Sequence, residues 1–535
     1  MKKFLKIAGE RCLYTVCQSV SALFGNQRLA RHLAEESERL PKSNGTRYYP
    51  VLPYKIGMIS DPFLYYDYQD TCDLRYIRPD VTEEALCELD LLLIASVWHG
   101  LYGEWTGAGK EGTQTNLRLH EIAKQCRRKN IPVAFYSKED PPNFEYFKNL
   151  AGDADYIFTS AEELIETYQR MFPGKPVFHL PFCTNPRLYH PIGGFIGRNA
   201  DAGERALHTA VFAGSWMPKY PKRIHAQENL FRWCRQEGLD VRIIDRNYSR
   251  NNPRYCYPVR YWPLLLPDMD YRLLGGVYKL HDYVLNLNSV TESGSMFAKR
   301  VYDALACGSL VLSNESRGME RIFPEVAVIR APEDLTRVLS ESAELRHRRR
   351  LDGIRRVMSG NTSHARIRQL LTYCGFSLKK PEREIAVIIS PETEYPDKVR
   401  EMFHRQTYPA KRLIDVQDTQ EDTRENMIRS CDMVAVWTDC HEYGPHFLED
   451  LINAFKYTDC RYVTGGGAGA GMSAEAKHVY VEEVRDKYAA VFWQTDNWRA
   501  DLTVLPDSFS LANGYCISQE SAYESGIERM VRVSA

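Results

Sequence analysis

Lys299, Arg300 and Asp303 combine residue types and spacing that suit a ligand site. They follow a polar, glycine-containing loop, residues 289–295, that comes after the apolar run 283–287. Free backbone N–H groups where such a loop enters a helix favour phosphate, and the two basic side chains add positive charge. Asp303, further along the helix, is placed to accept hydrogen bonds from a ribose. A phosphate end and a ribose end in one site predict a nucleotide ligand.

The elements around these residues form a strand–loop–helix–strand unit of a doubly wound sheet. Apolar residues recur at helical spacing after the loop, at Phe297, Val301, Ala304 and Leu305. Cys307-Gly308 ends the helix, and a second apolar strand spans 309–313. Doubly wound sheets bind ligands at the carboxyl ends of their strands, which is where this loop lies. The pattern alone leaves an alternative open, an ordinary βαβ unit with a solvated basic helix face.

The same segment resembles the donor-binding motif of GT-B glycosyltransferases, in particular the group-1 type related to spore-maturation glycosyltransferases. That motif typically reads LNxNSVxxSxTMxxRRVFE(L/A)LAxG. The residues that match it are Leu285, Asn286, Asn288, Ser289, Val290, Ser293, Met296, Arg300, Val301, Leu305, Ala306 and Gly308. Three positions depart from it, because Ser295 replaces Thr, Lys299 replaces Arg and Asp303 replaces the ribose-binding Glu. The resemblance implies nucleotide-sugar binding by Asn288, Ser295, Met296, Lys299, Arg300 and Asp303, with the ribose carboxylate kept.

Two further strand ends in the same half of the chain carry polar residues. Gly214-Ser215 ends the strand 209–213, and Arg223 follows it with a planar fork that suits phosphate. Asp245-Arg246 ends the strand 239–244 and resembles the family's (I/Y)DR stretch. We therefore expect these residues to contribute to the nucleotide-sugar site, with surface-loop charges as the alternative.

The first half of the chain presents residues to the opposite side of the expected cleft. His99 lies in SVWHG after one buried strand, and Glu139 and Asp140 lie in KEDP after the next. Both segments resemble family stretches, and parallel strands place such residues at one sheet edge. His99, Glu139 and Asp140 are the candidate catalytic residues, because acids in a cleft can be tuned for proton transfer. Asp140 as the N-cap of a following helix is the alternative.

Alternating strand and helix patterns predict an α/β protein with four parts. Residues 1–54 form amphipathic helices and a linker, 55–192 a Rossmann-like acceptor domain, and 205–375 a Rossmann-like donor domain. Two such domains in tandem describe the GT-B architecture. Residues 380–535 resemble a family-2-type GT-A module in which His441 replaces the second acid of the metal-binding DxD cluster after Asp439. We interpret this module as degenerate, without catalysis of its own, and as a dimerisation or acceptor-docking unit.

The amino-acid composition limits the classes of partner that the protein is expected to bind. The 535 residues include 69 Lys and Arg and 70 Asp and Glu, a balance that argues against a nucleic-acid binder. The 14 cysteines show no CxxC pair or Cys/His cluster, so we expect reduced thiols and no metal site. No apolar run is long enough to span a bilayer. The basic, amphipathic segment 1–24 either packs on the protein or contacts the inner face of a membrane, so the expected location is cytoplasmic.

The sequence therefore predicts a bacterial glycosyltransferase that uses a nucleotide-diphosphate sugar as substrate and needs no cofactor. The resemblance implies retaining, metal-independent transfer to a cell-surface polysaccharide, a teichoic-type polymer or a glycoprotein. One alternative is transfer of a polyol-phosphate from a CDP-linked donor on the same fold. Another is a non-catalytic pseudo-glycosyltransferase that scaffolds a partner enzyme. The sequence leaves the base, the sugar, the acceptor and the formation of a homodimer open.

Overall fold

The computed structural model describes residues 15–16, 18–19, 25–194, 208–250, 252–380, 382–417, 419–465, 478–494, 502–503 and 505–518. Most of the basic segment 1–24 lies outside these ranges, as do residues 195–207 and 466–477. The expectations for these segments stay predictions. None of the described helices is long and apolar enough to cross a membrane.

The first domain is a six-stranded parallel sheet with the order β2-β1-β3-β4-β5-β6. Its strands are β1 (Leu52–Ile59), β2 (Cys72–Tyr76), β3 (Leu91–Ala95), β4 (Val133–Ser137), β5 (Tyr156–Thr159) and β6 (Val177–His179). Its helices are α3 (Pro62–Tyr68), α4 (Glu83–Cys87), α5 (Gln114–Arg128), α6 (Phe144–Phe147) and α7 (Ile165–Met171). The strand order reverses between β1 and β3, so the loops after these two strands flank a crevice.

The second domain repeats this design with the order β12-β11-β10-β7-β8-β9, again parallel. Its strands are β7 (Thr209–Gly214), β8 (Asp240–Asp245), β9 (Leu265–Leu266), β10 (Tyr283–Asn286), β11 (Leu310–Ser313) and β12 (Ala327–Val328). Its helices are α8 (Pro221–Gln236), α9 (Leu274–Lys279), α10 (Arg300–Ala306), α11 (Arg317–Ile322), α12 (Pro332–Leu339) and α13 (Ala343–Gly360). Here the order reverses between β7 and β10, which places the Gly214 turn and the 287–299 loop at one crevice.

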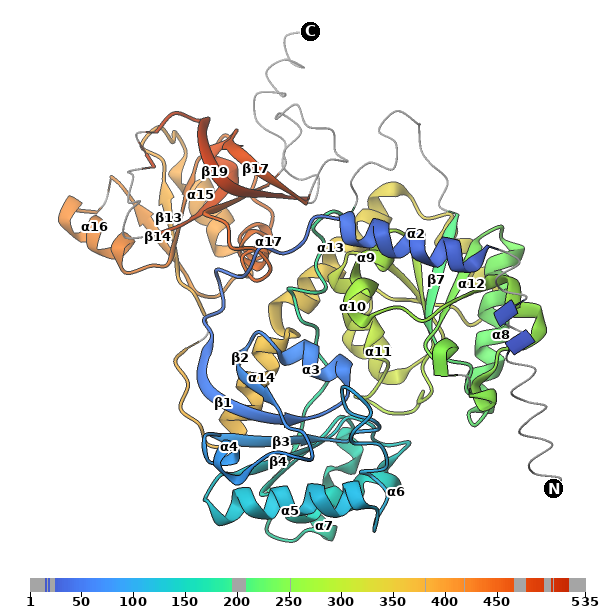
Figure 1. The fold of residues 1–535 in the computed structure, drawn as a ribbon. Helices are drawn as coiled ribbons and strands as arrows, with labels where there is room; N and C mark the ends of the chain where they lie inside the picture. Colours follow the sequence, from blue (N-terminus) through green and yellow to red (C-terminus); the bar gives the residue numbers. More distant parts are fainter. Residues whose placement is uncertain are drawn as a thin grey trace, which may run out of the picture.

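Helix α14 (Ser363–Tyr373) follows α13 but packs on the first domain. Ile367, Leu370 and Leu371 are buried in one core with residues of β1 and β3. The chain also crosses between the domains after β6, and the two crossings meet at a backbone bridge between Thr184 and Thr362. The expected fold class, two tandem Rossmann-like domains followed by a smaller α/β domain, is confirmed (Figure 1).

The third domain has a mixed seven-stranded sheet with the order β14-β13-β15-β18-β16-β19-β17. Its strands are β13 (Ile385–Ile389), β14 (Lys411–Asp415), β15 (Met433–Trp437), β16 (Tyr462–Gly465), β17 (Val479–Val484), β18 (Ala490–Trp493) and β19 (Phe509–Ile517). Its helices are α15 (Pro396–His404), α16 (Glu421–Arg429) and α17 (Phe447–Ala454). Strands β14, β13 and β15 are parallel, whereas β18 runs antiparallel to both of its neighbours.

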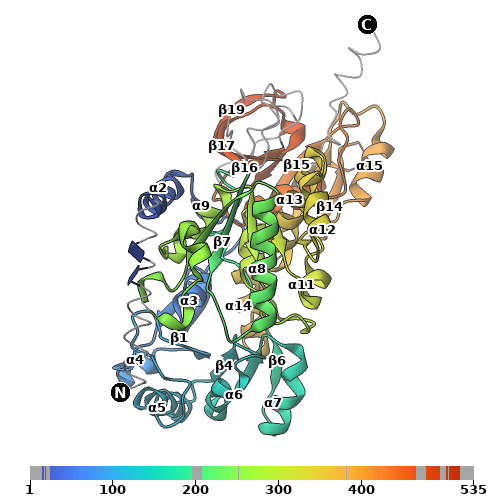
Figure 2. The same cartoon turned by 90° about the vertical axis from the view of Figure 1, so that its right-hand side faces the viewer.

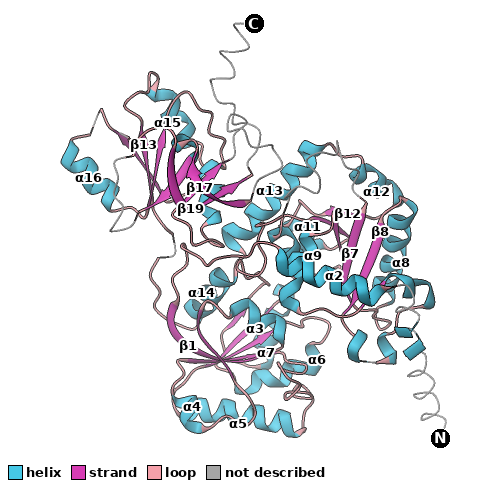
Figure 3. Ribbon diagram, turned by 45° about the horizontal axis from the view of Figure 1, so that its top comes forward, coloured by secondary structure: helices cyan, strands magenta, loops and turns pink. Residues whose placement is uncertain are grey.

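Figure 3 shows the three sheets as separate layers, and Figure 2 shows the third domain above the second, with α13 beneath it. Helices α13 and α17 belong to one continuous core that joins these two domains. Helix α2 (Asn26–Arg39) lies on the second domain, where Asn26 and Ser37 donate hydrogen bonds to backbone carbonyls. The segment 42–48 then runs along the third domain, with Arg47 paired to Asp459 at 2.8 Å.

Candidate functional site

The crevice of the second domain centres on Gly214, the last residue of β7. A Cβ at this position would lie 2.5 Å from the ring of Phe212 and 3.0 Å from a guanidinium nitrogen of Arg300. Real Cβ contacts are not as short as the one with Phe212, so a side chain here would displace that ring and crowd Arg300 at the end of β7. The glycine is therefore required by the packing of the site itself.

Arg300 is fixed at the edge of the sheet by three contacts. It donates hydrogen bonds to the carbonyl of Ala213 and, at 3.1 Å, to the side chain of Asn286, and it lies 4.7 Å from the centre of the Phe212 ring. Burial, with repulsion from Arg246, lowers the pKa of Arg300. Arg300 has no carboxylate partner among the described residues, and a guanidinium held in this way between strand ends is suited to an anionic ligand.

Arg223 is buried beneath the same turn. It donates to the carbonyl of Ser215 at 3.0 Å and to Gln227 at 3.2 Å. Burial, together with repulsion from Arg300 and Arg246, lowers its pKa to about 10, so the side chain stays charged at neutral pH. Arg223 thus supports the turn from below, and its positive charge adds to that of Arg300.

The end of β8 contributes Asp245 and Arg246. The buried Asp245 accepts the backbone N–H of Asn247 at 3.0 Å, and Asn247 in turn donates to the hydroxyl of Ser215 at 2.9 Å. Arg246 is exposed. Asp245 therefore shapes the loop, whereas Arg246 is the accessible charge of this strand end.

The loop before α10 differs from the sequence expectation. The helix begins at Arg300 and not at Phe297, and side chains already accept several of the loop amides. Asn288 accepts the N–H of Ala298 at 3.0 Å, and Ser293 accepts the N–H of Met296 at 2.9 Å. The expectation of free loop amides for phosphate is wrong at these positions, because Asn288 and Ser293 use them to hold the loop in shape.

Ser295 joins the two Rossmann-like domains. Its hydroxyl accepts the backbone N–H of Glu162, at the start of a helical turn in the first domain, at 2.9 Å. Arg321 of α11 reaches the carboxylate of the same Glu162 at 3.6 Å. The motif loop is thus closed against the first domain in this structure.

Lys299 and Asp303 face the same interdomain boundary and are buried. The ammonium of Lys299 lies 2.5 Å from Asp303 and 3.1 Å from Asp67 of α3 in the first domain. Thr184 and Tyr271 donate further hydrogen bonds to Asp303. The carboxylate expected to bind ribose is therefore occupied by protein groups, and its role toward ribose stays a prediction.

Across the cleft, Asp61 holds the loop after β3. Its carboxylate accepts the backbone N–H groups of Trp98, His99 and Gly100 at 2.9–3.2 Å, and the ammonium of Lys138 lies 3.2 Å away. Burial would raise the pKa of Asp61, but Lys138 and the backbone donors hold it below its usual range. Asp61 was not predicted from the sequence, although its place just after β1, at the same sheet edge as His99, was a usable signal.

His99 faces the basic side of the second domain. Burial and repulsion from Arg250 and Arg246 lower its pKa, with Asp61 acting in the opposite direction. Its Nδ1 lies 3.1 Å from the hydroxyl of Thr106. Arg250 and Arg246 thus act on His99 across the domain boundary, and the catalytic role of His99 stays a prediction.

Glu139 and Asp140 occupy different environments. Glu139 pairs with Lys138 at 2.9 Å and accepts from Asn143, which in turn receives a hydrogen bond from Lys219 of the second domain at 3.3 Å. Asp140 is fully buried and accepts the hydroxyl of Thr159 at 2.6 Å. Burial raises its pKa to about 6. Glu139 thus adjoins the domain boundary, and Asp140 lies within the first domain.

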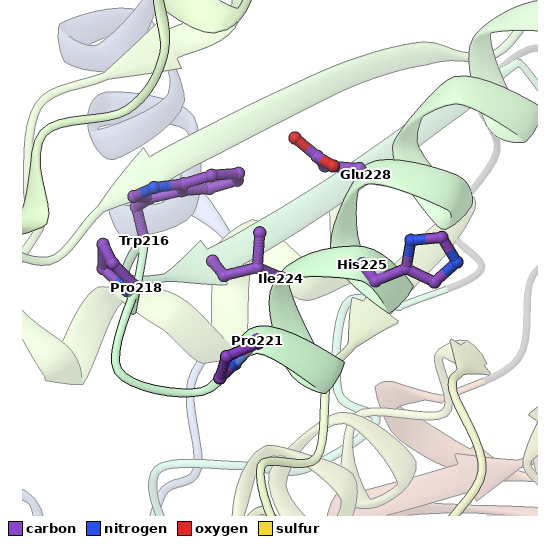
Figure 4. A pocket seen from close by; sticks show the side chains of 6 residues that line it. All are labelled: Trp216, Pro218, Pro221, Ile224, His225 and Glu228. Carbon is purple, nitrogen blue, oxygen red and sulfur yellow. The ribbon is translucent and has the colours of Figure 1, made fainter.

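A cavity of about 320 Å³ lies beside the start of α8. Figure 4 shows its walls, which are Trp216, Pro218, Pro221, Ile224, His225 and Glu228. None of the sequence-predicted site residues lines it, and Glu228 is paired with Arg260. We assign no role to this cavity.

The candidate metal-binding side chains of the third domain each contact a different protein group. Asp439 accepts the backbone N–H of Tyr395 at 2.9 Å, His441 contacts Asp486 at 2.9 Å, and Glu442 contacts Lys398 at 3.3 Å. The described residues contain no group of three His, Cys, Asp or Glu side chains arranged to hold a metal ion.

Most of the second domain matches the model of a known protein family. Residues 227–372 match the model of a family described as "Glycosyl transferase-like". The matched range contains α10 and its preceding loop, so it includes the motif from which the sequence analysis began. The second domain is therefore similar to glycosyltransferase-like proteins. The expected enzyme class, a glycosyltransferase, is confirmed at this coarse level, and no curated protein matches the chain.

Solved structures give more distant likenesses. The N-terminal domain of Candida albicans trehalose-6-phosphate phosphatase matches at 10% identity and TM-score 0.38, over 63% of this chain and 100% of its own. An alpha-glucosyltransferase in complex with UDP and a DNA 13-mer matches at 10% identity and TM-score 0.41, over 61% and 100%. Accessory secretory proteins of Streptococcus pneumoniae match at 10% identity and TM-score 0.32, over 53% of each chain. These likenesses are too distant to carry any functional conclusion for this glycosyltransferase-like chain.

Proposed function

We propose that the protein transfers a sugar from a nucleotide-diphosphate sugar, bound to the second domain, to an acceptor that enters along the first domain. The convergence of three arginines on the Gly214 turn carries this proposal. Arg300 and Arg223 are fixed around the turn, and burial, with repulsion from Arg246, lowers the pKa values of both. Such a concentration of positive charge at the topological switch point suits a diphosphate.

The same charges would assist the reaction. Cleavage of the sugar–phosphate bond leaves a nucleoside diphosphate, whose leaving oxygen gains negative charge in the transition state. Preorganised guanidinium groups stabilise that charge more strongly in a site from which water is excluded. The contacts of Ser295 and Lys299 with the first domain support such exclusion, because they close the boundary beside the motif loop.

His99 is our candidate for the group that meets the acceptor or the transferred sugar. Asp61 fixes its loop, and burial and nearby arginines favour its neutral form, which can accept a proton. We carry retaining, metal-independent transfer over from the family resemblance. The acceptor classes that we propose are a cell-surface polysaccharide, a teichoic-type polymer and a glycoprotein.

For the third domain we propose a degenerate GT-A-like module that docks and does not catalyse. Its parallel strands β14, β13 and β15 resemble the nucleotide-binding half of a GT-A fold, which supports the likeness. Asp439 and His441 are each engaged with other protein groups, which supports the absence of catalysis.

One observation favours a second candidate, a non-catalytic scaffold. Asp303 is 3% exposed and its oxygens already accept hydrogen bonds from Lys299, Thr184 and Tyr271. A protein that never binds a nucleotide could keep this carboxylate permanently closed.

A thermal-shift panel separates the two candidates. UDP, GDP, TDP and CDP, with their sugar and glycerol conjugates, are added with and without EDTA. A ligand at about 100 times its Kd adds roughly 2.7 kcal/mol of stability. We expect one nucleotide to stabilise the wild type equally with and without EDTA. The same nucleotide should not stabilise Arg300→Ala. It should stabilise the control Arg254→Ala, which changes an exposed arginine of the same domain, as much as the wild type. The absence of any shift with the wild type would favour the scaffold.

A further inference from the structure

The Asp303 carboxylate has little room for another hydrogen-bond donor. One oxygen accepts from Lys299 at 2.5 Å and from Thr184 at 2.8 Å, and the other accepts from Tyr271 at 3.2 Å. A carboxylate offers about four lone-pair positions, so one is left here. The two neighbouring hydroxyls of a ribose need two such lone-pair positions. A protein group must therefore leave Asp303 before both hydroxyls can bind to it.

Lys299 is the group with an alternative partner. Its ammonium lies between Asp303 and Asp67, at 2.5 Å and 3.1 Å, and it donates to the hydroxyl of Tyr271 at 2.7 Å. Asp67 belongs to α3 of the first domain, whereas Lys299 and Asp303 belong to the second. One positive charge is thus shared by two acids from opposite sides of the domain boundary.

Tyr271 has the same choice of partner. Its single hydroxyl proton lies within reach of an Asp303 oxygen at 3.2 Å and of an Asp67 oxygen at 3.4 Å. Lys299 and Tyr271 can therefore both turn from Asp303 to Asp67 by small movements. The pair of acids and the pair of donors form a two-state arrangement.

Asp67 is the incompletely satisfied member. It is fully buried, and its Oδ2 has no hydrogen-bond partner among the residues that the structure describes. Burial and repulsion from Asp303 raise the pKa of Asp67 to about 8, against the attraction of Lys299. Asp67 therefore carries a proton at neutral pH while Lys299 stays on Asp303.

We propose that Asp67 is a positioning residue for the nucleotide-sugar: when ribose hydroxyls take Asp303, Lys299 and Tyr271 turn to Asp67, which releases its proton. This inference rests on the proposed function and deepens it. Lys299 stays protonated throughout, its hydrogen bond to Asp303 is replaced by ribose O–H groups, and the proton of Asp67 passes to the solvent. Donor binding is thereby coupled to the contact between the two domains.

The other groups around Asp67 do not provide the proton. Burial raises the pKa values of Tyr68, Tyr136, Tyr189, Tyr271 and Cys183, so these groups stay neutral below pH 8. The remaining charge among these neighbours is the guanidinium of Arg366 on α14, which acts on Cys183 and Tyr136. Within the described surroundings Asp67 is the group whose charge changes near neutrality.

Calorimetry on the full chain tests the proposal. UDP-glucose, GDP-mannose and CDP-glycerol are titrated at pH 7 in two buffers of different ionisation enthalpy, which counts the protons released. These conjugates are chosen because both phosphates are esterified and do not titrate near neutrality. We expect close to one proton released per ligand bound, and an affinity that rises by up to about tenfold per pH unit between pH 6 and 8.

Three comparisons isolate the role of Asp67. Asp67→Asn should release no proton and bind about tenfold more weakly, because Lys299 keeps Asp303 as its only charged partner. Asp70→Asn, just after the same helix and paired with Arg187, should behave as the wild type. The 2′-deoxy analogue of the ligand that binds should release no proton from the wild type, because it lacks one of the hydroxyls that displace Lys299.

The possible failures are distinct. If no conjugate binds the wild type, the proposed function fails and the role of Asp67 with it. If one binds without releasing a proton, or if Asp67→Asn releases as much as the wild type, the positioning role is overturned and the proposed function stands. The wild-type measurement needs no variant, so misfolding of Asp67→Asn leaves the proposal open to refutation.

Discussion

Asp61 illustrates how single residues shape the cleft without facing it. Three consecutive backbone N–H groups, those of Trp98, His99 and Gly100, converge on its carboxylate, and Lys138 balances its charge. An amide in place of the carboxylate keeps the volume but removes the charge and one acceptor. The loop that carries His99 then loses part of its support.

We expect Asp61→Asn to lower the rate of sugar transfer by up to about 100-fold, since small misplacements of a cleft group have effects of this size. Nucleotide-induced stabilisation should persist, because the donor residues lie on the other domain. Steady-state rates and thermal shifts measure the two effects separately. The control is Asp73→Asn, which removes a pair with Arg75. An equal loss of nucleotide binding and of transfer rate in Asp61→Asn would contradict the role of Asp61 in supporting the His99 loop.

At the scale of elements, the contact between α13 and α17 fixes the third domain to the second. Arg355 forms two hydrogen bonds of 2.8 Å with Asp450, and both side chains are largely buried. Ser359 contacts Glu449 and Asn453 along the same face. The interface is therefore held by polar groups as well as by the shared apolar core.

Asp450→Ala should loosen this contact, because it leaves Arg355 buried with Asp352 as its remaining acid. Removal of one partner of a buried pair typically costs about 3–5 kcal/mol. Hydrogen exchange of α17 and proteolysis within residues 375–384 should both increase, while the nucleotide thermal shift is retained. Arg356→Ala, which removes the more exposed pair with Glu325, serves as the comparison. Unchanged exchange in Asp450→Ala would show that the apolar core alone holds the domain.

At the scale of the whole molecule, Lys456 joins the third domain, the second domain and the segment 42–48. Its ammonium donates to the carbonyl of Met358 at 2.8 Å and to Asn453 at 2.7 Å, and it lies 4.9 Å from the centre of the Tyr48 ring. Burial lowers its pKa to about 7. The folded protein therefore binds fewer protons here than the unfolded chain between pH 7 and 10.5.

Stability from this group consequently rises with pH across that window and falls as the pH drops toward 7. Between pH 7 and 9 the expected gain is ~2–3 kcal/mol, since each pH unit corresponds to about 1.4 kcal/mol. Melting temperatures of the wild type and Lys456→Gln over this range measure it, because glutamine keeps a donor without the titration. The wild-type curve should lie below that of Lys456→Gln at low pH and approach it as the pH rises, because the penalty for burying the ammonium disappears when Lys456 loses its proton. Parallel curves would refute it.

Local pattern was sufficient for many elements and insufficient for others. The runs at β3 and β4, which precede His99 and Glu139, were predicted as buried strands, because buried parallel strands need largely apolar runs. Strand β2 (Cys72–Tyr76) was missed because its polar residues lie at the sheet edge. Strands β17 and β19 were missed because exposed polar residues interrupt their apolar runs.

The sequence alone determined the two Rossmann-like units and the glycosyltransferase-type motif. It also determined the strand ends that carry Gly214, Asp245, His99 and Glu139. These features depend on periodicity and on the geometry of parallel sheets. Only the tertiary structure decided which charges meet. It placed Arg223 beneath the Gly214 turn, closed the amides of the motif loop with Asn288 and Ser293, and set Asp67 against Lys299 and Asp303. Asp67 and Lys299 lie far apart along the chain and meet only when the two domains pack against each other. The contacts within the second domain depend on the exact path of the backbone, which periodicity does not determine.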